Sequence, residues 1–258
     1  MCGIAGLIAA DPSALSNIRL KQMTDRIAHR GPDGEGQWIS PDGKTGLAHR
    51  RLSIIDLSDA GKQPMHYLDR YSITFNGEIY NYVELRELCE KQGYRFHSHT
   101  DTEVIMALYH WKGTDCLQLF DGMFAFALYD EQEKTVFAAR DRFGEKPFYY
   151  YTEPGHTFFF GSEMKALWKI GIDKTIDRKM LLNYLSMGHV QNCIDKEQTF
   201  YESIYSLPPA HYLTMNTVGV PSRIKRYWNI NRENKIDISL PDASERFLFL
   251  LNNSVRSE

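Results

Sequence analysis

The sequence predicts an α+β fold in which short strands are interleaved with a few helices. Residues 2–10 (CGIAGLIAA) are almost uniformly apolar, which is typical of a strand buried on both faces. Residues 124–129 and 135–140 are further apolar runs, and the polar segment 130–134 between them indicates a hairpin. Residues 102–112 carry apolar side chains at three- and four-residue intervals, as an amphipathic helix does. Both element types therefore occur in the same part of the chain.

The remaining elements are expected from shorter patterns. Further strands are expected at residues 46–52, 71–76 and 158–160. Helices are expected at residues 14–29, 82–93 and 180–185. Gly93 is a suitable stop for the second of these helices. The segment HRGPDGEG, which follows the first helix, is dense in Gly and Pro and is expected to be a loop.

The character of the sequence changes after Trp228. Residues 229–238 are polar and charged, as in a linker, and residues 240–258 have the pattern of one more helix. We therefore expect one domain over residues 2–215 and a separate linker and helix over residues 216–258.

This last helix has an apolar face with little left in the chain to cover it. Ser244 or Asp242 is a suitable N-cap for it. The apolar stripe consists of Phe247, Leu250, Leu251 and Val255. A face of this kind usually packs against a partner or another domain.

The composition restricts the possible classes of function. The 258 residues are 43% hydrophobic and 24% charged, which is ordinary for a globular protein. The 30 basic and 33 acidic residues give a net charge of −3, which argues against a nucleic-acid or anionic-membrane partner. No apolar run approaches the ~18 residues of a membrane span, and the start lacks the basic region of a secretory signal. Because the four cysteines form no CxxC pair, we expect a cytoplasmic protein with reduced thiols and no metal site.

Cys2 is the first candidate for a catalytic residue. A small second residue is common, because it permits removal of the initiator methionine, so position alone is weak evidence. Once Met1 is removed, Cys2 carries a thiol and a free α-amine, with reference pKa values of ~8.5 and ~7.7–8.0. The amine can then accept the thiol proton without any separate histidine. Such a thiolate can attack a carboxamide carbonyl, expel ammonia and leave a thioester for water to hydrolyse.

The dipeptide Asn76-Gly77 is a candidate oxyanion hole. It offers a side-chain amide and a backbone N–H immediately after an expected strand. Taken alone, Asn-Gly is far more often a turn.

Eight sequence blocks occur in one order along nearly the whole chain: MCGIAGL, HRGPDGEG, LAHRRLSIIDLSDAGKQPM, FNGEIYNYVELR, TDTEV, LFDGMFAFALYD, ARDRFGEKPFYY and FGSEMKAL. In these blocks the chain resembles the glutaminase domain of the glutamine-hydrolysing asparagine synthetase family. That domain is a class II glutamine amidotransferase. The resemblance implies an N-terminal-nucleophile hydrolase fold, with αββα layers and two stacked, mainly antiparallel sheets.

The resemblance also implies roles for individual residues. Cys2 matches the nucleophile, and Asn76 and Gly77 match the oxyanion hole. Arg51 matches the arginine that holds the α-carboxylate of glutamine, which suits a guanidinium. Only the register of the block selects it over the adjacent Arg50.

Further positions match the rest of the substrate pocket. Glu78 and Asp101 match positions that face the α-amino group of glutamine. The backbone that lines the pocket in the family matches Leu52, Ser53, Ile54 and Ile55.

The resemblance further implies what the whole enzyme does. The glutaminase half would hydrolyse glutamine without a cofactor, and its ammonia would serve ATP-dependent amidation of aspartate. ATP and Mg²⁺ are expected only in the synthetase domain, whose Ser-Gly-Gly-x-Asp-Ser signature is absent because this chain contains no Gly-Gly. That domain is expected in the same polypeptide or as a separate chain. A homodimer is an open alternative for the assembly.

Two other functions stay open from the sequence. Members of the same branch amidate other carboxylates, for instance in surface-polysaccharide pathways. A non-catalytic domain is the second alternative, if Met1 is retained, because the amine then lies one residue from the thiol.

Several other residues are given structural interpretations. His29 and His49 are expected to form structural hydrogen bonds. The aromatic run at residues 148–151 is expected to lie in the core, since no basic run accompanies it. The charged segments at residues 140–142 and 163–165 are expected to have a structural or interface role.

Overall fold

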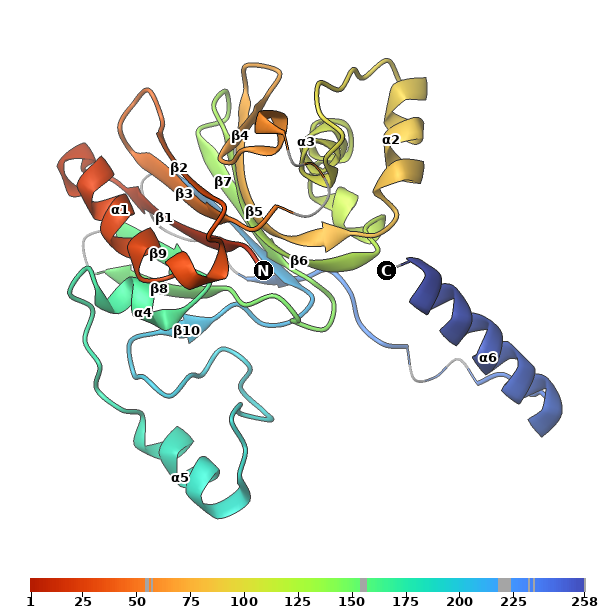
Figure 1. Ribbon diagram of the computed structural model, residues 1–258. Helices are drawn as coiled ribbons and strands as arrows, with labels where there is room; N and C mark the ends of the chain where they lie inside the picture. Colours follow the sequence, from red (N-terminus) through yellow and green to blue (C-terminus); the bar gives the residue numbers. More distant parts are fainter. Residues whose placement is uncertain are drawn as a thin grey trace.

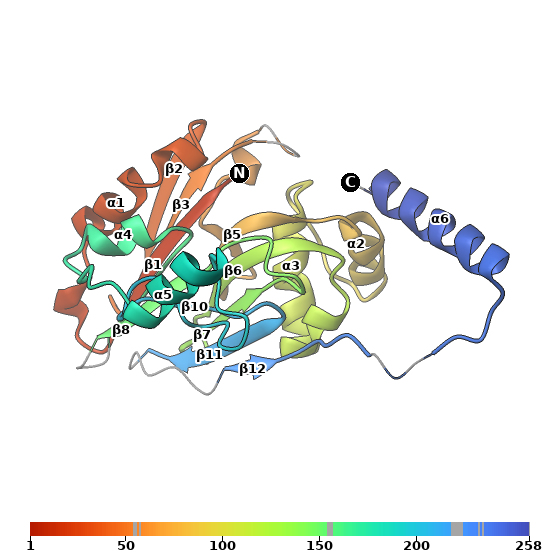
Figure 2. The same cartoon turned by 90° about the horizontal axis from the view of Figure 1, so that it is seen from below.

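The computed structural model describes residues 1–53, 56, 58–153, 157–217, 224–231, 233 and 235–257. Two six-stranded sheets lie face to face, and helices cover their outer faces, which gives four layers in the order α, β, β, α (Figure 1 and Figure 2). This confirms the expected α+β class and αββα layering. Neighbouring strands in both sheets pair antiparallel.

The first sheet has the order β10-β8-β9-β1-β3-β2, with the bounds Tyr205–Ser206, Tyr149–Glu153, Thr157–Gly161, Gly3–Ala9, Thr45–Arg51 and Gly34–Ile39. The second has the order β12-β11-β7-β6-β5-β4, with the bounds Lys225–Arg226, His211–Asn216, Thr135–Arg140, Gly122–Asp130, Tyr71–Ile79 and Met65–Tyr67. The helices are α1 Asn17–Asp25, α2 Tyr82–Lys91, α3 Asp101–Lys112, α4 Met164–Trp168, α5 Arg178–Met187 and α6 Leu240–Ser257. Short 3₁₀ turns occupy Pro12–Ala14, Ala28–Arg30, Asp59–Gly61 and Gly113–Gln118.

The alternation of side chains along β1 explains how one strand serves two cores. Ile4 and Ile8 face the second sheet, while Ala5 and Leu7 face α1 and α4. All seven residues of β1 are buried, as the uniformly apolar sequence predicts. The strand that follows Cys2 is therefore held on both sides.

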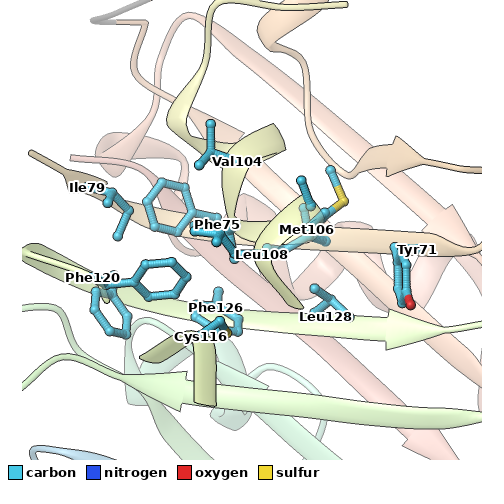
Figure 3. Close-up of a cluster of buried hydrophobic side chains, with 14 of the residues drawn as sticks. Tyr71, Phe75, Ile79, Val104, Met106, Leu108, Cys116, Phe120, Phe126 and Leu128 are labelled. Carbon is cyan, nitrogen blue, oxygen red and sulfur yellow. The ribbon is translucent and has the colours of Figure 1, made fainter. Parts of the chain in front are cut away.

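The outer face of the second sheet forms the largest core. Phe75 from β5, Phe126 from β6 and Leu108 from α3 meet in this cluster (Figure 3). The inner face of β6 instead carries smaller residues, Ala125 and Ala127, which pack against the first sheet. The two sheets can approach closely there.

Helix α3 begins where side chains accept its free N–H groups. Thr100 is its N-cap and accepts a hydrogen bond from Glu103 N at 3.4 Å. The Glu103 carboxylate accepts further bonds from His97 N and Ser98 N at 2.9 and 2.8 Å. Because α3 begins at Asp101, these contacts at the start of the helix also fix the position of the Asp101 carboxylate.

Most expected elements are present, with shifted ends. The strand expected at residues 71–76 continues to Ile79 as β5, and the helix expected at 14–29 is shortened to Asn17–Asp25. The loop expected in HRGPDGEG is wrong at its end, because β2 begins at Gly34. The expected N-caps of α6 are also wrong. The helix begins at Leu240, and Ser239 accepts the hydrogen bond from Asp242 N at 3.3 Å.

The second sheet continues past residue 215. Strand β11 ends at Asn216, and β12 (Lys225–Arg226) pairs with it, so a domain boundary after residue 215 would divide this sheet. Helix α6 lies apart from the sheets in both views (Figure 1 and Figure 2). Its stripe residues are exposed, including Phe247 at 63% and Val255 at 65%. Within the described residues, no helix combines the length and the apolarity that a membrane crossing requires.

Candidate active site

A pocket of about 120 Å³ opens beside the N-terminus, where segments of both sheets meet. The start of β1 and the end of β3 come from the first sheet, while β5 comes from the second and α3 from its outer layer. The lining residues are Met1, Cys2, His49, Arg51, Leu52, Ser53, Asp56, Gly61, Gln63, Phe75, Asn76, Gly77, Glu78, Thr100, Asp101, Thr102, Met123 and Lys146. The pocket thus collects every site residue expected from the sequence except Ile54 and Ile55, which lie outside the described residues. Its size suits one small molecule such as an amino acid.

Cys2 is held by hydrogen bonds at its thiol and at its backbone carbonyl. Leu52 N donates to the thiol sulfur at 3.4 Å, and the thiol donates to Leu52 O at 3.5 Å. Arg30 Nε donates to the carbonyl oxygen of Cys2 at 2.9 Å. Burial raises the pKa of the Cys2 thiol, which the Leu52 N–H partly opposes. The thiol therefore needs a nearby base before it can act as a nucleophile.

Asn76 presents a hydrogen-bond donor with no acceptor. Its side chain is only 1% exposed, and Nδ2 has no partner among the described residues. A buried, unpaired amide N–H costs free energy in the free protein and is unusual in native structures. Such a group in a pocket with a thiol is suited to stabilise an oxyanion.

On the edge of β5 that faces away from β6, and beyond the end of β4, two side chains bind the backbone next to Asn76. Gln63 Oε1 accepts a hydrogen bond from Phe75 N at 2.6 Å. His49 Nε2 lies 3.1 Å from Phe75 O and must donate to it, because a carbonyl oxygen only accepts. Gln63 Nε2 also donates to Thr102 Oγ1 at 3.3 Å, which links β5 to the start of α3.

His49 cannot serve as the base for Cys2. Burial lowers its pKa to about 3, and the nearby charge of Arg51 acts in the same direction. A base whose conjugate acid is this strong accepts protons poorly near neutral pH. The structure thus confirms a hydrogen-bonding role for His49.

Gly77 has no room for a side chain. A Cβ atom there would lie 2.2 Å from Met123 O and 2.7 Å from Phe124 Cα. The glycine therefore lets β5 lie close against β6 beside Asn76.

Adjacent arginines in β3 point to opposite faces of the sheet. Arg50 pairs with Asp25 and with Glu35, the latter at 2.7 Å. Arg51 reaches the pocket, where its guanidinium donates to Asp56 O and, at 2.9 Å, to Ser58 O. Among the described residues these bonds use two of its five N–H groups, and the others can serve a bound carboxylate.

Two carboxylates lie at the α3 side of the pocket. Asp101 is 4% exposed and accepts a hydrogen bond from Ile79 N at 3.0 Å. Burial raises the pKa of Asp101 to about 6, and the negative charge of Glu78 adds to this effect. A cation between the two carboxylates would oppose both effects, because an opposite charge favours the ionised form of a carboxyl group.

The backbone after Arg51 is held from a distant loop. Asp33 Oδ2 accepts a hydrogen bond from Ser53 N at 2.8 Å, and Asp33 N donates to Arg51 O at 3.0 Å. Leu52 and Ser53 consequently stay at the pocket wall beside Cys2.

The charged segments that the sequence left without a catalytic role are structural. Arg140 donates to three backbone oxygens, those of Gly144, Lys146 and Leu207, at 2.6–2.7 Å. Asp141, which is 1% exposed, accepts from four backbone N–H groups of Phe124, Phe143, Glu145 and Lys146. Both side chains therefore hold the loop between β7 and β8.

A second charged group lies behind the nucleophile. Glu163 pairs with Lys165 at 2.7 Å, with His29 at 2.9 Å and with Arg30 at 3.2 Å. Since Arg30 also binds Cys2 O, this cluster supports the nucleophile from outside the pocket.

Sequence reasoning missed Gln63 and Lys146. Gln63 lies within the block LAHRRLSIIDLSDAGKQPM, and Lys146 within ARDRFGEKPFYY, but no local pattern marks either as a pocket residue. Their positions depend on contacts with residues far away in the sequence.

Known proteins show the same domain. The family model described as "Glutamine amidotransferase domain" matches residues 1–228. Glutamine-hydrolyzing asparagine synthetase 3 of Bacillus subtilis (strain 168) is 36% identical over 256 residues, covering 96% of this chain and 40% of that protein. Glutamine-hydrolyzing asparagine synthetase 1 of the same organism is 42% identical over 194 residues, covering 74% and 30%. The chain thus spans less than half the length of these relatives.

A solved structure shows the same fold. Glutamine phosphoribosylpyrophosphate amidotransferase from B. subtilis superposes with a TM-score of 0.65 at 19% identity, covering 90% of this chain and 50% of that one. This likeness confirms the expected N-terminal-nucleophile hydrolase fold. The family match and the pocket around Cys2 together lead to one conclusion: the chain belongs to the glutamine amidotransferase domain family, whose enzymes take glutamine as amido donor.

Proposed function

We propose that this chain hydrolyses L-glutamine to L-glutamate and ammonia through a thioester on Cys2. The observation that carries the proposal is the pairing of a thiol with a buried, unpartnered amide donor, Asn76 Nδ2, in one pocket. The proposal includes removal of Met1, which frees the α-amine of Cys2.

In the first half-reaction, the free amine takes the thiol proton and Sγ attacks the carboxamide carbon of glutamine. A C–S bond forms, and the negative charge that develops on oxygen is stabilised by Asn76 Nδ2 and the backbone at Gly77. The C–N bond then breaks, and the proton held by the amine leaves with ammonia.

In the second half-reaction, water attacks the thioester. The amine accepts a proton from this water, the C–S bond breaks, and glutamate leaves as the thiol is restored. No metal or cofactor takes part in either half-reaction.

The rest of the pocket would hold the amino-acid end of glutamine. Arg51 has N–H groups left for the α-carboxylate. Asp101 and Glu78 would hold the α-amino group, whose charge complements theirs. The walls at Leu52 and Ser53 complete the pocket, and Ile54 and Ile55 are proposed to continue it.

We also propose that the ammonia serves ATP-dependent amidation of aspartate to asparagine. Two relatives that cover most of this chain are named glutamine-hydrolyzing asparagine synthetases, which favours aspartate over another carboxylate acceptor. The linker and α6 would begin a synthetase domain that binds ATP and Mg²⁺, in the same polypeptide or supplied as a separate chain. We place the enzyme in the cytoplasm, and a homodimer remains one assembly to test.

The test is glutamate release from glutamine by protein whose intact mass shows loss of Met1, in buffer free of metal and nucleotide. Cys2→Ala is expected to abolish release, and Cys193→Ala, which changes an exposed thiol, to leave it unchanged. Absence of glutamate above background from the processed wild type would overturn the proposal.

A further inference from the structure

Lys146 carries a positive charge at the pocket without a carboxylate partner. The residue is 5% exposed, and its Nζ donates to Met1 Sδ at 3.2 Å. No ion pair of Nζ is found within the described part of the chain, whereas Lys21, Lys134 and Lys165 all pair with carboxylates. Because buried charges are normally paired, this arrangement calls for a functional explanation.

The protein holds Lys146 in place from both sides. Asp141 Oδ2 accepts a hydrogen bond from Lys146 N at 2.9 Å, and Arg140 Nε donates to Lys146 O at 2.7 Å. Burial lowers the pKa of the Lys146 ammonium. The carboxylates of Glu145, Asp141 and Glu78 act in the opposite direction, and the charge of Arg30 adds to the effect of burial. The fold therefore keeps Lys146 at a buried position, although burial disfavours the charged form of its side chain.

The ammonium lies close to the place where the α-amine of Cys2 is created. Met1 Sδ is five covalent bonds from the nitrogen of Cys2, so Lys146 Nζ lies within roughly 9 Å of that nitrogen. Lys146, Met1 and Cys2 also line the same pocket. When Met1 is removed, the ammonium loses its sulfur acceptor and shares the pocket with the new amine.

We propose that Lys146 is a positioning residue whose positive charge favours the neutral form of the Cys2 α-amine, so that this amine can take the thiol proton. The physical reason is that a like charge nearby disfavours protonation of an amine. This inference rests on the proposed glutaminase function.

Other charges face the same pocket. Glu78 from β5 and Asp101 from α3 favour the protonated amine, whereas Arg51 from β3 disfavours it. Arg30, which binds Cys2 O, adds a positive charge that Glu163 offsets, and Asp141 and Glu145 lie beside Lys146 in its loop.

Bound glutamine changes this balance. Its α-amino group would neutralise Glu78 and Asp101, and its α-carboxylate would neutralise Arg51. The charge of Lys146 still acts on the amine in this complex, because the nearby carboxylates of Glu145 and Asp141 form no ion pair with its Nζ within the described residues. The effect should therefore be largest in the substrate complex and appear in kcat.

The experiment compares kcat for glutamine hydrolysis against pH in processed wild type, Lys146→Met and Lys146→Arg. In Lys146→Met the acid limb of the profile is expected to move up by about one pH unit, which is about tenfold in rate below the limb. The variant and wild type should converge at alkaline pH, and Lys146→Arg should restore the wild-type limb. Lys91→Met, which removes one exposed charge from α2, is the matched control and should leave the profile unchanged.

A second measurement does not depend on turnover. The Cys2 α-amine of ¹⁵N-cysteine-labelled protein can be titrated by NMR, and its midpoint should rise in Lys146→Met. An equal loss of kcat at every pH, or an unmoved midpoint in folded protein, would overturn the inference while the glutaminase stands. An inactive processed wild type would instead overturn the proposed function.

Discussion

Replacement of Asn76 by leucine separates catalysis from stability in this fold. Leucine has nearly the shape of asparagine but no N–H. If Asn76 Nδ2 stabilises the oxyanion, Asn76→Leu should lower kcat by about 10²–10³-fold, the effect of removing one such donor. Because the donor is already buried and fixed, KM for glutamine should change little.

The effect on stability should have the opposite sign. In the free protein Nδ2 is buried and has no partner among the residues that the structure describes, and an unsatisfied donor costs ~1–3 kcal/mol. Asn76→Leu removes that group, so the free energy of unfolding is expected to rise by about 1 kcal/mol, or ~2–4 °C in Tm for a chain of this size. The assays are coupled detection of glutamate for kcat and calorimetry for Tm.

Thr74→Val is the matched control on the same face of β5. Thr74 Oγ1 donates to Ala48 O at 3.0 Å, so this variant removes a satisfied hydrogen bond. It should lower Tm by ~2–4 °C and leave kcat unchanged. The reasoning would be refuted if Asn76→Leu lost less than tenfold in kcat, or if it lost stability as Thr74→Val does.

Two further predictions concern groups around Asn76. Asp101 releases its proton near pH 6 in the folded protein and near ~3.9 in the unfolded chain. The free energy of unfolding therefore falls as the pH rises between these two values. Asp101→Asn, which cannot ionise, should be more stable than the wild type by roughly 2–3 kcal/mol above pH 7. KM for glutamine should rise in the wild type below about pH 6 and be high at all pH in Asp101→Asn, and a wild-type KM without this step would contradict the assignment. Gln63→Leu leaves Phe75 N–H buried and unpaired, so it should cost about 1–3 kcal/mol and also lower kcat, since Asn76 is the next residue. Urea unfolding and the glutamate assay measure both, and unchanged kcat with lost stability would limit Gln63 to a structural role.

The sequence predicts those parts of the fold that depend on local patterns. The uniformly apolar β1, the β6–β7 hairpin and the α3 stripe were identified because their periodicity reflects which faces are buried. Element ends were less accurate, since they depend on partners. For example, β5 continues to Ile79 because β6 supplies paired residues as far as Gly122.

Glycine in β2 shows why one local signal misled. The Gly- and Pro-rich segment predicts a loop at Gly36, but this residue lies in β2, where a Cβ atom would come within 2.0 Å of Gln63 O. The residue allows the close approach of another segment, and that requirement leaves no trace in the neighbouring sequence.

The residues of the pocket could not be predicted from local sequence patterns alone. Only the family resemblance relates Cys2, Arg51, Asn76 and Asp101, because no local pattern connects them. The two side chains that fix Phe75 come from positions 12 and 26 residues earlier, and Lys146 is 145 residues from Met1. Contacts between residues so far apart in the sequence form only in the folded protein, so a local sequence pattern cannot predict them.

Two of the buried polar atoms that the fold leaves unsatisfied belong to residues of the pocket. Asn76 Nδ2 and His49 Nδ1 are buried without partners in the described structure, and both residues line the pocket. Lys146 adds a charge whose hydrogen-bond acceptor is a sulfur atom. In a protein selected only for stability, such groups would be paired or replaced by apolar ones. Among the described residues, unpartnered buried atoms also occur away from the pocket, for example Thr45 Oγ1 and Trp168 Nε1, so what distinguishes Asn76 is its place in one pocket with the Cys2 thiol. The opposite effects expected of Asn76→Leu on kcat and Tm follow from that place.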